Sequence, residues 1–176
     1  AERYADYFPQ YIKKGIKDGL LSDKLLKFDL KRLAAKLVPD RDNTIDYVGM
    51  QNLSDRYFLR DRNKKLIETP QSFYMRVAMG VSIPEFEFGK MDANDVAEKL
   101  YEIYSLKLAS PSTPTLFNAG TVRSQCSSCY LSDTHDSIDG IFSSLWDNAR
   151  LSKHAGGLGF HVTSIRATGS YINGTN

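Results

Sequence analysis

Apolar residues recur every three or four positions through roughly the first 110 residues of this chain. This spacing is typical of amphipathic helices that bury one face. Polar capping residues, prolines and glycines stand between the apolar stretches and mark where each helix begins or ends. The sequence therefore predicts a scaffold of α-helices with short connections and no cluster of catalytic residues.

Each predicted helix has a recognisable start or stop. The basic turn Arg60–Lys65 between two of them is interpreted as a solvated loop, with a phosphate contact as the alternative. The expected segments are a short helix or turn interrupted by Pro9, a helix from a Ser22 cap to a stop at Pro39, a helix after Asn43 or Thr44 that buries Val48 and Leu53, a helix from a Thr69 cap to Gly80, and a helix capped by Asp92 or Asn94.

The pattern changes at residue 110, where Pro111 and Pro114 exclude a helix interior. Thr115–Phe117 is predicted as a short strand that enters a turn. We therefore divide the chain into a helical domain, residues 1–109, and an α/β segment, residues 110–176. The elements predicted further along this segment are a strand at Ser127–Leu131, a capped helix from Asp136–Asp139 to Gly156–Gly157, a strand at Phe160–Arg166 and a flexible loop from Gly169.

Composition excludes several classes of protein. The 41% hydrophobic and 25% charged residues are ordinary for a globular domain, and a net charge of +2 indicates neither a nucleic acid nor a membrane as partner. No apolar stretch approaches the ~20 residues of a membrane helix, and the first residues do not form a signal peptide. Two cysteines are too few for a disulfide-stapled secreted fold. A cytoplasmic location is expected.

The two cysteines, Cys126 and Cys129, have C-x-x-C spacing, which three interpretations fit. They could form half of a zinc site, although His135, His154 and His161 do not follow at finger-like spacing. They could be a dithiol redox pair, although a strand and not a helix is predicted to follow them. They could also be two small buried residues. The spacing alone leaves burial and redox chemistry open.

The glycine-rich segment 155–159 does not match G-x-G-x-x-G and follows a helix where the dinucleotide motif would open one. Its default interpretation is a helix C-cap that approaches a strand closely. Nucleotide binding is the alternative, because backbone without side chains admits a ligand and Lys153 and Arg166 flank the segment with positive charge.

Longer motifs occur at Thr113–Asn118, Arg123–Cys129, Ser152–Gly159 and Ile165–Asn176. In residues and spacing they resemble the large, catalytic subunit of class I ribonucleotide reductase, and two stretches of the helical domain are similar to it as well, Leu53–Phe58 and Glu68–Ala78. The resemblance covers nearly the whole chain but only the first part of that enzyme. It implies a helical domain followed by the first strands and helix of a ten-stranded α/β barrel, completed by another polypeptide.

The resemblance assigns roles by position. Cys129 matches the redox-active cysteine that, with a second cysteine far downstream, delivers two electrons to the ribose of a ribonucleoside diphosphate. Thr113, Ser128 and Gly157 match the substrate site. The positions that match the site of the specificity effector, a deoxynucleoside triphosphate or ATP bound between two subunits, are Asp136, Ser137, Lys153, Arg166 and Ile172.

The implied reaction makes deoxyribonucleotides for DNA replication. A thiyl radical removes the ribose 3′ hydrogen, and its radical comes from a metal cofactor in a separate small subunit, so no cofactor or metal is expected in this chain itself. The implied partners are the remaining part of the catalytic subunit, the radical-generating small subunit, a second catalytic subunit, and thioredoxin or glutaredoxin as reductant.

Two features depart from the family pattern. Cys126 stands where the family usually has an apolar residue, so we interpret it as a buried neutral thiol. The ATP-binding cone that many class I subunits carry before the helical domain is not expected here. We interpret the chain as part of a split or intein-interrupted subunit, or as a fragment of one. Two alternatives remain: a piece of a class II, adenosylcobalamin-dependent reductase, and a non-catalytic module that binds nucleotide or partner.

Overall fold

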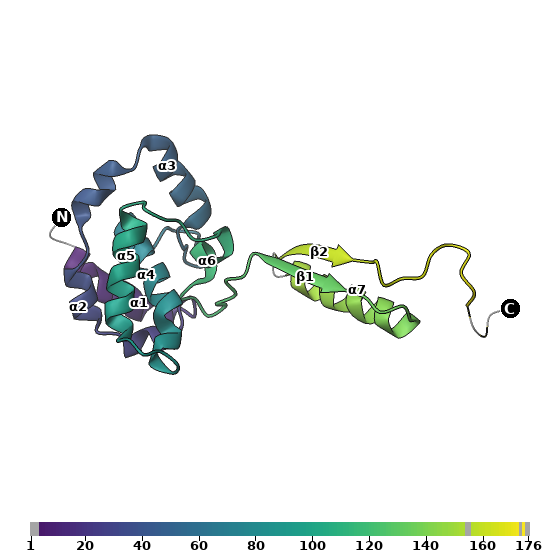
Figure 1. The fold of residues 1–176 in the computed structure, drawn as a ribbon. Helices are drawn as coiled ribbons and strands as arrows, with labels where there is room; N and C mark the ends of the chain where they lie inside the picture. Colours follow the sequence, from purple (N-terminus) through teal and green to yellow (C-terminus); the bar gives the residue numbers. More distant parts are fainter. Residues whose placement is uncertain (1–3, 154–155, 173, 175–176) are drawn as a thin grey trace. The chain divides into compact units, whose positions relative to one another are not determined.

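The computed structural model describes residues 4–153, 156–172 and 174. The chain divides into two compact units, Ala1–Cys126 and Ser127–Asn176, each of which is considered by itself. The first contains helices, and the second contains two parallel strands and a helix (Figure 1). The predicted order of a helical domain followed by an open α/β segment is confirmed. Residues 110–126 belong to the helical unit.

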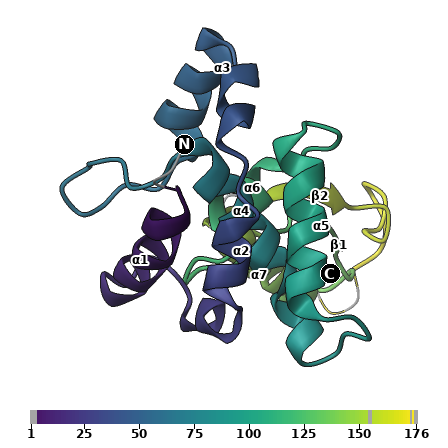
Figure 2. The same ribbon diagram turned by 90° about the vertical axis from the view of Figure 1, so that its left-hand side faces the viewer.

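The helical unit packs short helices around an apolar core, with α4 and α5 lying side by side (Figures 1 and 2). Phe8, Leu25, Leu33, Met75 and Met79 are fully buried in it. Its elements are α1 (Tyr4–Lys17), the 3-10 helices η1 (Asp23–Lys27), η2 (Pro39–Thr44) and η4 (Ile83–Phe86), α2 (Leu30–Ala35), α3 (Tyr47–Asn52), the π-helix η3 (Leu53–Tyr57), α4 (Pro70–Ser82), α5 (Ala93–Ser105) and α6 (Thr113–Asn118).

One predicted helix is broken in the structure, and the next one begins later than expected. The helix expected from Ser22 to Pro39 is broken, because the Asp29 side chain accepts a hydrogen bond from the Arg32 amide (3.0 Å) and starts a new helix, α2. The next helix begins at Tyr47, capped by Asp46, and the expectation that it buries Val48 was wrong, since that side chain is 71% exposed. In both cases an aspartate inside the predicted helix, Asp29 or Asp46, caps the observed helix and sets where it starts.

The caps of α4 and α5 are confirmed. The Thr69 amide donates to Ser72 Oγ at 2.9 Å, and Pro70 occupies the first position of α4, where a missing amide hydrogen has no cost. Asp92 caps α5 by accepting from the amides of Asn94 and Asp95. The prediction that Gly80 ends its helix was wrong, because α4 continues to Ser82.

Gly80 lies inside α4, and this position has to be glycine because another part of the backbone passes directly over it. A Cβ added there would lie 2.1 Å from the Gly120 nitrogen and 2.4 Å from the Ala119 carbonyl carbon. Replacing glycine with alanine in a helix usually stabilises it by ~1 kcal/mol, but here the clash reverses the sign. We expect Gly80→Ala to lower the free energy of unfolding in urea by about 1–3 kcal/mol. Val81→Ala, at a half-exposed neighbouring position, is the control, and an unchanged Gly80→Ala protein would contradict the close packing.

The segment after residue 110 is helical where a strand was predicted. Thr115–Phe117 lies in α6, so that prediction was wrong. Pro114 sits in the first turn of α6, where proline is compatible with a helix, whereas the prediction treated it as a helix breaker. At the other end, the carbonyls of Leu116 and Ala119 accept hydrogen bonds from the Arg76 guanidinium.

The second unit is a β-α-β arrangement made of β1 (Cys129–Asp133), α7 (Ile138–Lys153) and β2 (Gly157–His161). The strands are parallel, with Cys129 opposite Gly157 and Asp133 opposite His161. Parallel neighbours need a crossover connection, which α7 provides. The predicted first strand and helix are confirmed with small shifts, but the strand expected at Phe160–Arg166 begins three residues earlier and ends at His161.

One face of α7 is apolar and exposed. Ser144 and Asn148 contact the first strand: Ser144 Oγ donates to the Asp133 carbonyl at 3.0 Å, and Asn148 Oδ1 accepts from Ser132 Oγ at 2.9 Å. Such a face on a two-stranded sheet needs further structure to cover it. Its members, half or more exposed in the part of the chain described, are Ile138, Phe142, Leu145 and Trp146.

Candidate functional site

Cys129 is the first residue of β1, and its thiol is exposed. Gly157 lies opposite it in β2, and the Gly157 amide donates to the Ser128 carbonyl at 2.9 Å. A Cβ on Gly157 would lie 3.3 Å from that carbonyl oxygen and 3.8 Å from Cys129 Sγ. The second unit therefore brings together Cys129, Ser128 and Gly157, and the absence of a side chain at Gly157 keeps the space beside the sulfur open.

Cys126 lies in a different environment. It packs against the cluster formed by Phe58, Phe73, Val77 and Ala119, and its Sγ lies 3.5 Å from the Ser124 carbonyl. Burial raises the pKa of the Cys126 thiol, an effect that Arg76 partly opposes. A raised pKa keeps the thiol protonated and less reactive at neutral pH. These contacts support the interpretation of Cys126 as a neutral thiol, although the side chain is half-buried and not fully enclosed.

Thr113 lies in the helical unit, at the first residue of α6. Its side chain is exposed, and its Oγ1 is 3.3 Å from the hydroxyl of Tyr57. The neighbouring hydroxyls of Ser112 and Thr115 bond to each other, and Thr115 also donates to the Cys126 carbonyl. Thr113 thus differs from its neighbours in its partner, because its exposed hydroxyl meets the Tyr57 phenol and not another residue of α6.

Asp136 and Arg166 form an ion pair in the second unit, with Arg166 Nε 2.7 Å from Asp136 Oδ2. The same guanidinium donates to the carbonyls of Tyr171 and Asp136. Ser137 caps α7, since its Oγ accepts from the Gly140 amide at 3.0 Å, as the sequence predicts. Three predicted effector residues, and the loop that carries Ile172, therefore meet beside the start of α7.

Lys153 is not part of this group. It is the last residue of the 16-residue helix α7, so it lies roughly 24 Å along the helix axis from Ser137. Within one chain, Lys153 and the residues at the start of α7 therefore do not contact the same nucleotide. The Gly156 amide donates to the Leu151 carbonyl in the last turn of α7, at 3.2 Å, whereas Gly157 belongs to the following strand. The residues between, 154–155, lie outside the described ranges, so the predicted glycine C-cap stays a prediction.

Glu68 and Arg76 form a buried ion pair, and the sequence analysis assigned neither residue a role. Arg76 and Glu68 are fully buried side chains with Nε and Oε1 2.6 Å apart. Burial disfavours the charged guanidinium, but Glu68 and Tyr11 more than offset this and raise the pKa of Arg76. Both residues lie in the stretch Glu68–Ala78, and its resemblance to the family was the available signal. Arg76 also holds the end of α6, the helix that carries Thr113.

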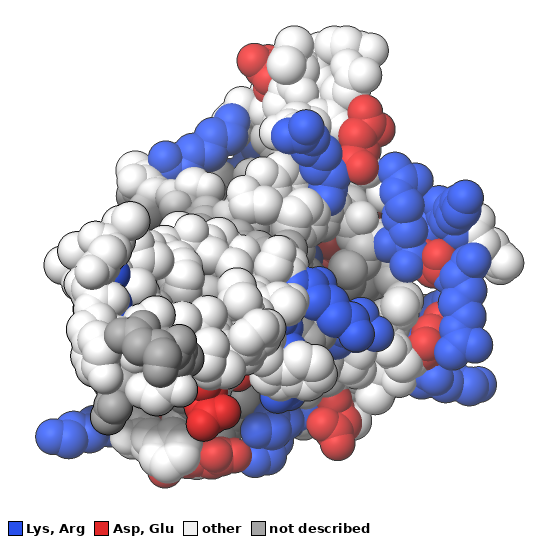
Figure 3. Space-filling view, turned by 90° about the vertical axis from the view of Figure 1, so that its right-hand side faces the viewer, with Lys and Arg blue, Asp and Glu red and all other residues white. Residues whose placement is uncertain are grey.

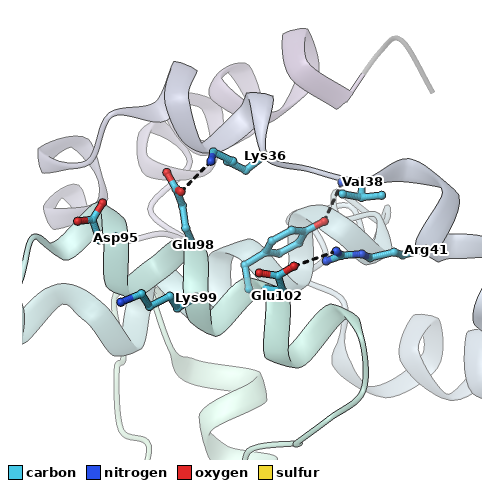
Figure 4. A pocket seen from close by; sticks show the side chains of 8 residues that line it. Lys36, Val38, Arg41, Asp95, Glu98, Lys99 and Glu102 are labelled. Carbon is cyan, nitrogen blue, oxygen red and sulfur yellow. Dashed lines mark hydrogen bonds and ion pairs between the residues drawn. The ribbon is translucent and has the colours of Figure 1, made fainter.

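A surface pocket of about 350 Å³ lies between α5 and the segment around Lys36–Arg41 (Figure 4). Its charged side chains are paired, with Lys36 3.1 Å from Glu98 and Arg41 3.5 Å from Glu102. The Val38 amide donates to the Tyr101 hydroxyl at its rim. Because the charges compensate each other, the pocket does not present one sign to an ionic ligand, and we assign it no function.

Other surface features place few constraints on the function. Acidic and basic side chains are interspersed on the face shown in Figure 3. Across the described ranges, no helix is long and apolar enough to cross a membrane, and no three His, Cys, Asp or Glu side chains gather as a metal site. His154, one of the three histidines considered as zinc ligands, lies outside the described residues together with Ala155 of the glycine segment.

Two family models match the chain. The all-alpha domain of ribonucleotide reductase matches residues 44–124, and the barrel domain of ribonucleotide reductase matches residues 127–176. Together the matches cover about three quarters of the sequence. The gap between them falls where the two compact units divide.

Individual relatives agree with these matches. The chain is 46% identical over 173 residues to the ribonucleoside-diphosphate reductase subunit alpha of Chlamydia muridarum, which is 98% of this chain and 16% of that protein. It is 41% identical over 169 residues to the corresponding subunit of Helicobacter pylori, 96% of this chain and 20% of that protein. The large subunit of Arabidopsis thaliana is 40% identical over 168 residues, with 93% and 20% covered. The chain thus spans a fifth or less of the length of these relatives.

Proposed function

Since the chain belongs to the family of ribonucleotide reductase large subunits, we propose that it supplies the helical domain and the opening β-α-β unit of a catalytic subunit that reduces ribonucleoside diphosphates. The observation that carries this proposal is the exposed thiol of Cys129 beside the open position at Gly157. The activity is proposed for the whole subunit to which this segment corresponds.

In this proposal Cys129 is one of two thiols that reduce the substrate. The two thiols lose two electrons and two protons as a disulfide forms, and the 2′ carbon loses its hydroxyl as water and gains a hydrogen. An exposed thiol suits this role because a disulfide must afterwards be reached by an external dithiol, for which thioredoxin and glutaredoxin are the proposed partners. Ser128, Gly157 and Thr113 are proposed to contact the substrate, as hydroxyl and backbone groups that bind a nucleoside diphosphate.

A direct assay tests this function. The complete large subunit containing this sequence is mixed with a radical-generating small subunit, a dithiol reductant and a ribonucleoside diphosphate, and deoxynucleoside diphosphate is quantified by chromatography. Native mass spectrometry with and without a deoxynucleoside triphosphate reports the assembly in parallel. Product that depends on both subunits and on the dithiol supports the proposal, whereas nucleotide binding without product favours the non-catalytic binding module.

We further propose that Asp136, Ser137, Arg166 and Ile172 contribute to an effector site for a deoxynucleoside triphosphate or ATP. Arg166 has five N–H donors, and three of them make the hydrogen bonds given above, so within the described residues two remain for phosphate oxygens. Asp136 holds the guanidinium in place. Lys153, at the far end of α7, is proposed to serve a nucleotide shared with a second catalytic subunit, in keeping with an effector site between two subunits.

Replacing Arg166 with glutamine should weaken effector binding by about ten- to a hundredfold, because hydrogen bonds to charged groups are lost. Isothermal titration of the complete subunit with a deoxynucleoside triphosphate measures the change. Arg62→Gln, which removes an exposed arginine of the helical unit, is the matched control and should bind as the unmodified protein does. Equal affinities for all three proteins would show that Arg166 does not contact the effector.

The remaining partners follow from the same proposal. The radical cofactor is assigned to the small subunit, and the exposed apolar face of α7 is assigned to contacts with other parts of the assembled catalytic subunits. The cytoplasm is the proposed location, as for an enzyme that supplies deoxyribonucleotides for DNA replication. The relatives named above are ribonucleoside-diphosphate reductases, so a class II adenosylcobalamin-dependent enzyme is not favoured.

A further inference from the structure

Tyr57 occupies an unusual backbone position. It is the last residue of the π-helix η3, which follows α3 directly, and the Phe58 amide bonds to the Leu53 carbonyl five residues earlier at 2.9 Å. A π turn inserts one residue into the α-helical pattern and so rotates the residues after it to a different side of the helix. Such turns are rare and are frequent at functional sites. The position of the Tyr57 side chain is therefore set by a local departure from regular helix.

Aromatic contacts hold the Tyr57 ring. It stacks on Phe117 of α6, with ring centroids 5.0 Å apart and planes at 19°, and it lies 6.4 Å from Phe73 of α4. Packing between two aromatic rings limits the orientations that the Tyr57 ring adopts. The phenol hydroxyl is consequently aimed at a fixed point, and the atom found there is Thr113 Oγ1, at 3.3 Å.

The chemistry of the two hydroxyls gives this contact a direction. Either hydroxyl has the geometry to donate, and because a phenol is more acidic than an aliphatic alcohol we assign Tyr57 as the donor and Thr113 as the acceptor. The single hydrogen of Thr113 then points away from Tyr57. In the described part of the chain, the Thr113 side chain has no other hydrogen-bond partner, and it is exposed. Its hydrogen is therefore available to an acceptor outside this unit.

We propose that Tyr57 is a positioning residue for substrate: it fixes the Thr113 hydroxyl so that this hydroxyl donates to an acceptor oxygen of the nucleoside diphosphate. Hydrogen bonds in a chain polarise one another, so donation by Tyr57 also makes Thr113 a better donor. Arg76 fixes the opposite end of α6 through the carbonyls of Leu116 and Ala119. The helix that carries Thr113 is thus held at both ends by the helical domain.

This inference rests on the proposed function of Thr113, and a double-mutant cycle separates the two. In the assembled reductase at saturating effector, kcat and KM for the ribonucleoside diphosphate are measured for the unmodified enzyme, Tyr57→Phe, Thr113→Val and the double variant. Tyr57→Phe keeps the stack on Phe117 and removes only the hydroxyl. We expect it to raise KM about three- to tenfold with kcat changed less than about twofold, and the double variant to be no worse than Thr113→Val alone.

Each other outcome has a definite meaning. If Thr113→Val raises KM and Tyr57→Phe does not, or if their effects simply add, Tyr57 does not position Thr113 and the proposed function stands. If Thr113→Val leaves KM unchanged, Thr113 does not bind substrate and both proposals for it fail. Tyr47→Phe, at a tyrosine of α3 that is 80% exposed, is the matched control, and an unchanged thermal midpoint in all variants shows that the fold is intact.

Discussion

Replacing Cys129 with serine is expected to reduce steady-state turnover of the assembled reductase to background, a loss on the order of 10³-fold or more, as for other residues that act directly in the chemical step. A serine hydroxyl occupies nearly the same space at the start of β1, but it has no sulfur and cannot be oxidised to a disulfide with a second cysteine. Cys129 is exposed and joins β2 through the backbone of its strand, so the substitution should leave the fold unchanged. Product formation with a ribonucleoside diphosphate and dithiol is the measurement.

Two controls make this result specific to the thiol. Effector affinity should be unchanged in Cys129→Ser, because Asp136 and Arg166 lie beyond the other end of β1. Cys126→Ser should retain turnover, since Cys126 is a half-buried thiol with a raised pKa in the helical unit. Full activity of Cys129→Ser with multiple turnovers would refute the redox role and leave a binding module as the better description.

Local sequence signals predicted much of the helical unit. The caps at Thr69, Asp92 and Ser137 were found because a cap depends on residues only two or three positions apart. The same locality explains a failure at Pro114, because a proline in the first turn of a helix and a proline that breaks one look alike in sequence. A strand was therefore predicted at Thr115–Phe117, where the structure has helix α6.

The errors that remain come from contacts between distant residues. Gly80 was expected to end α4, but it lies inside the helix and is glycine because the backbone at Gly120 leaves no room for a Cβ; nothing near Gly80 in sequence indicates this. The ion pair of Asp136 with Arg166 spans 30 residues. The site residues themselves came from family resemblance, since C-x-x-C spacing left both burial and redox chemistry open.

The buried pair of Arg76 and Glu68 gives the largest expected effect on stability. Glu68 accepts from the Arg76 guanidinium through both carboxylate oxygens, and also from the Leu59 amide and the Tyr11 hydroxyl. Glu68→Gln removes the countercharge and leaves a guanidinium without a charged partner in the core. We expect this to lower the free energy of unfolding by about 3–5 kcal/mol, measured by urea denaturation followed by circular dichroism.

A comparison of variants distinguishes charge from packing. Arg76→Met alone removes the bonds to α6 and leaves Glu68 without a cation, so it should be similarly destabilising, whereas the double variant Glu68→Gln/Arg76→Met should lose less than the sum of the two changes. Lys14→Gln, which breaks the exposed pair with Asp18, should give no measurable change. If Glu68→Gln unfolds at the same urea concentration as the unmodified protein, the pair does not stabilise the core. Because Arg76 bonds to the carbonyls that end α6, the destabilised variants should also show faster hydrogen exchange in the helix that carries Thr113.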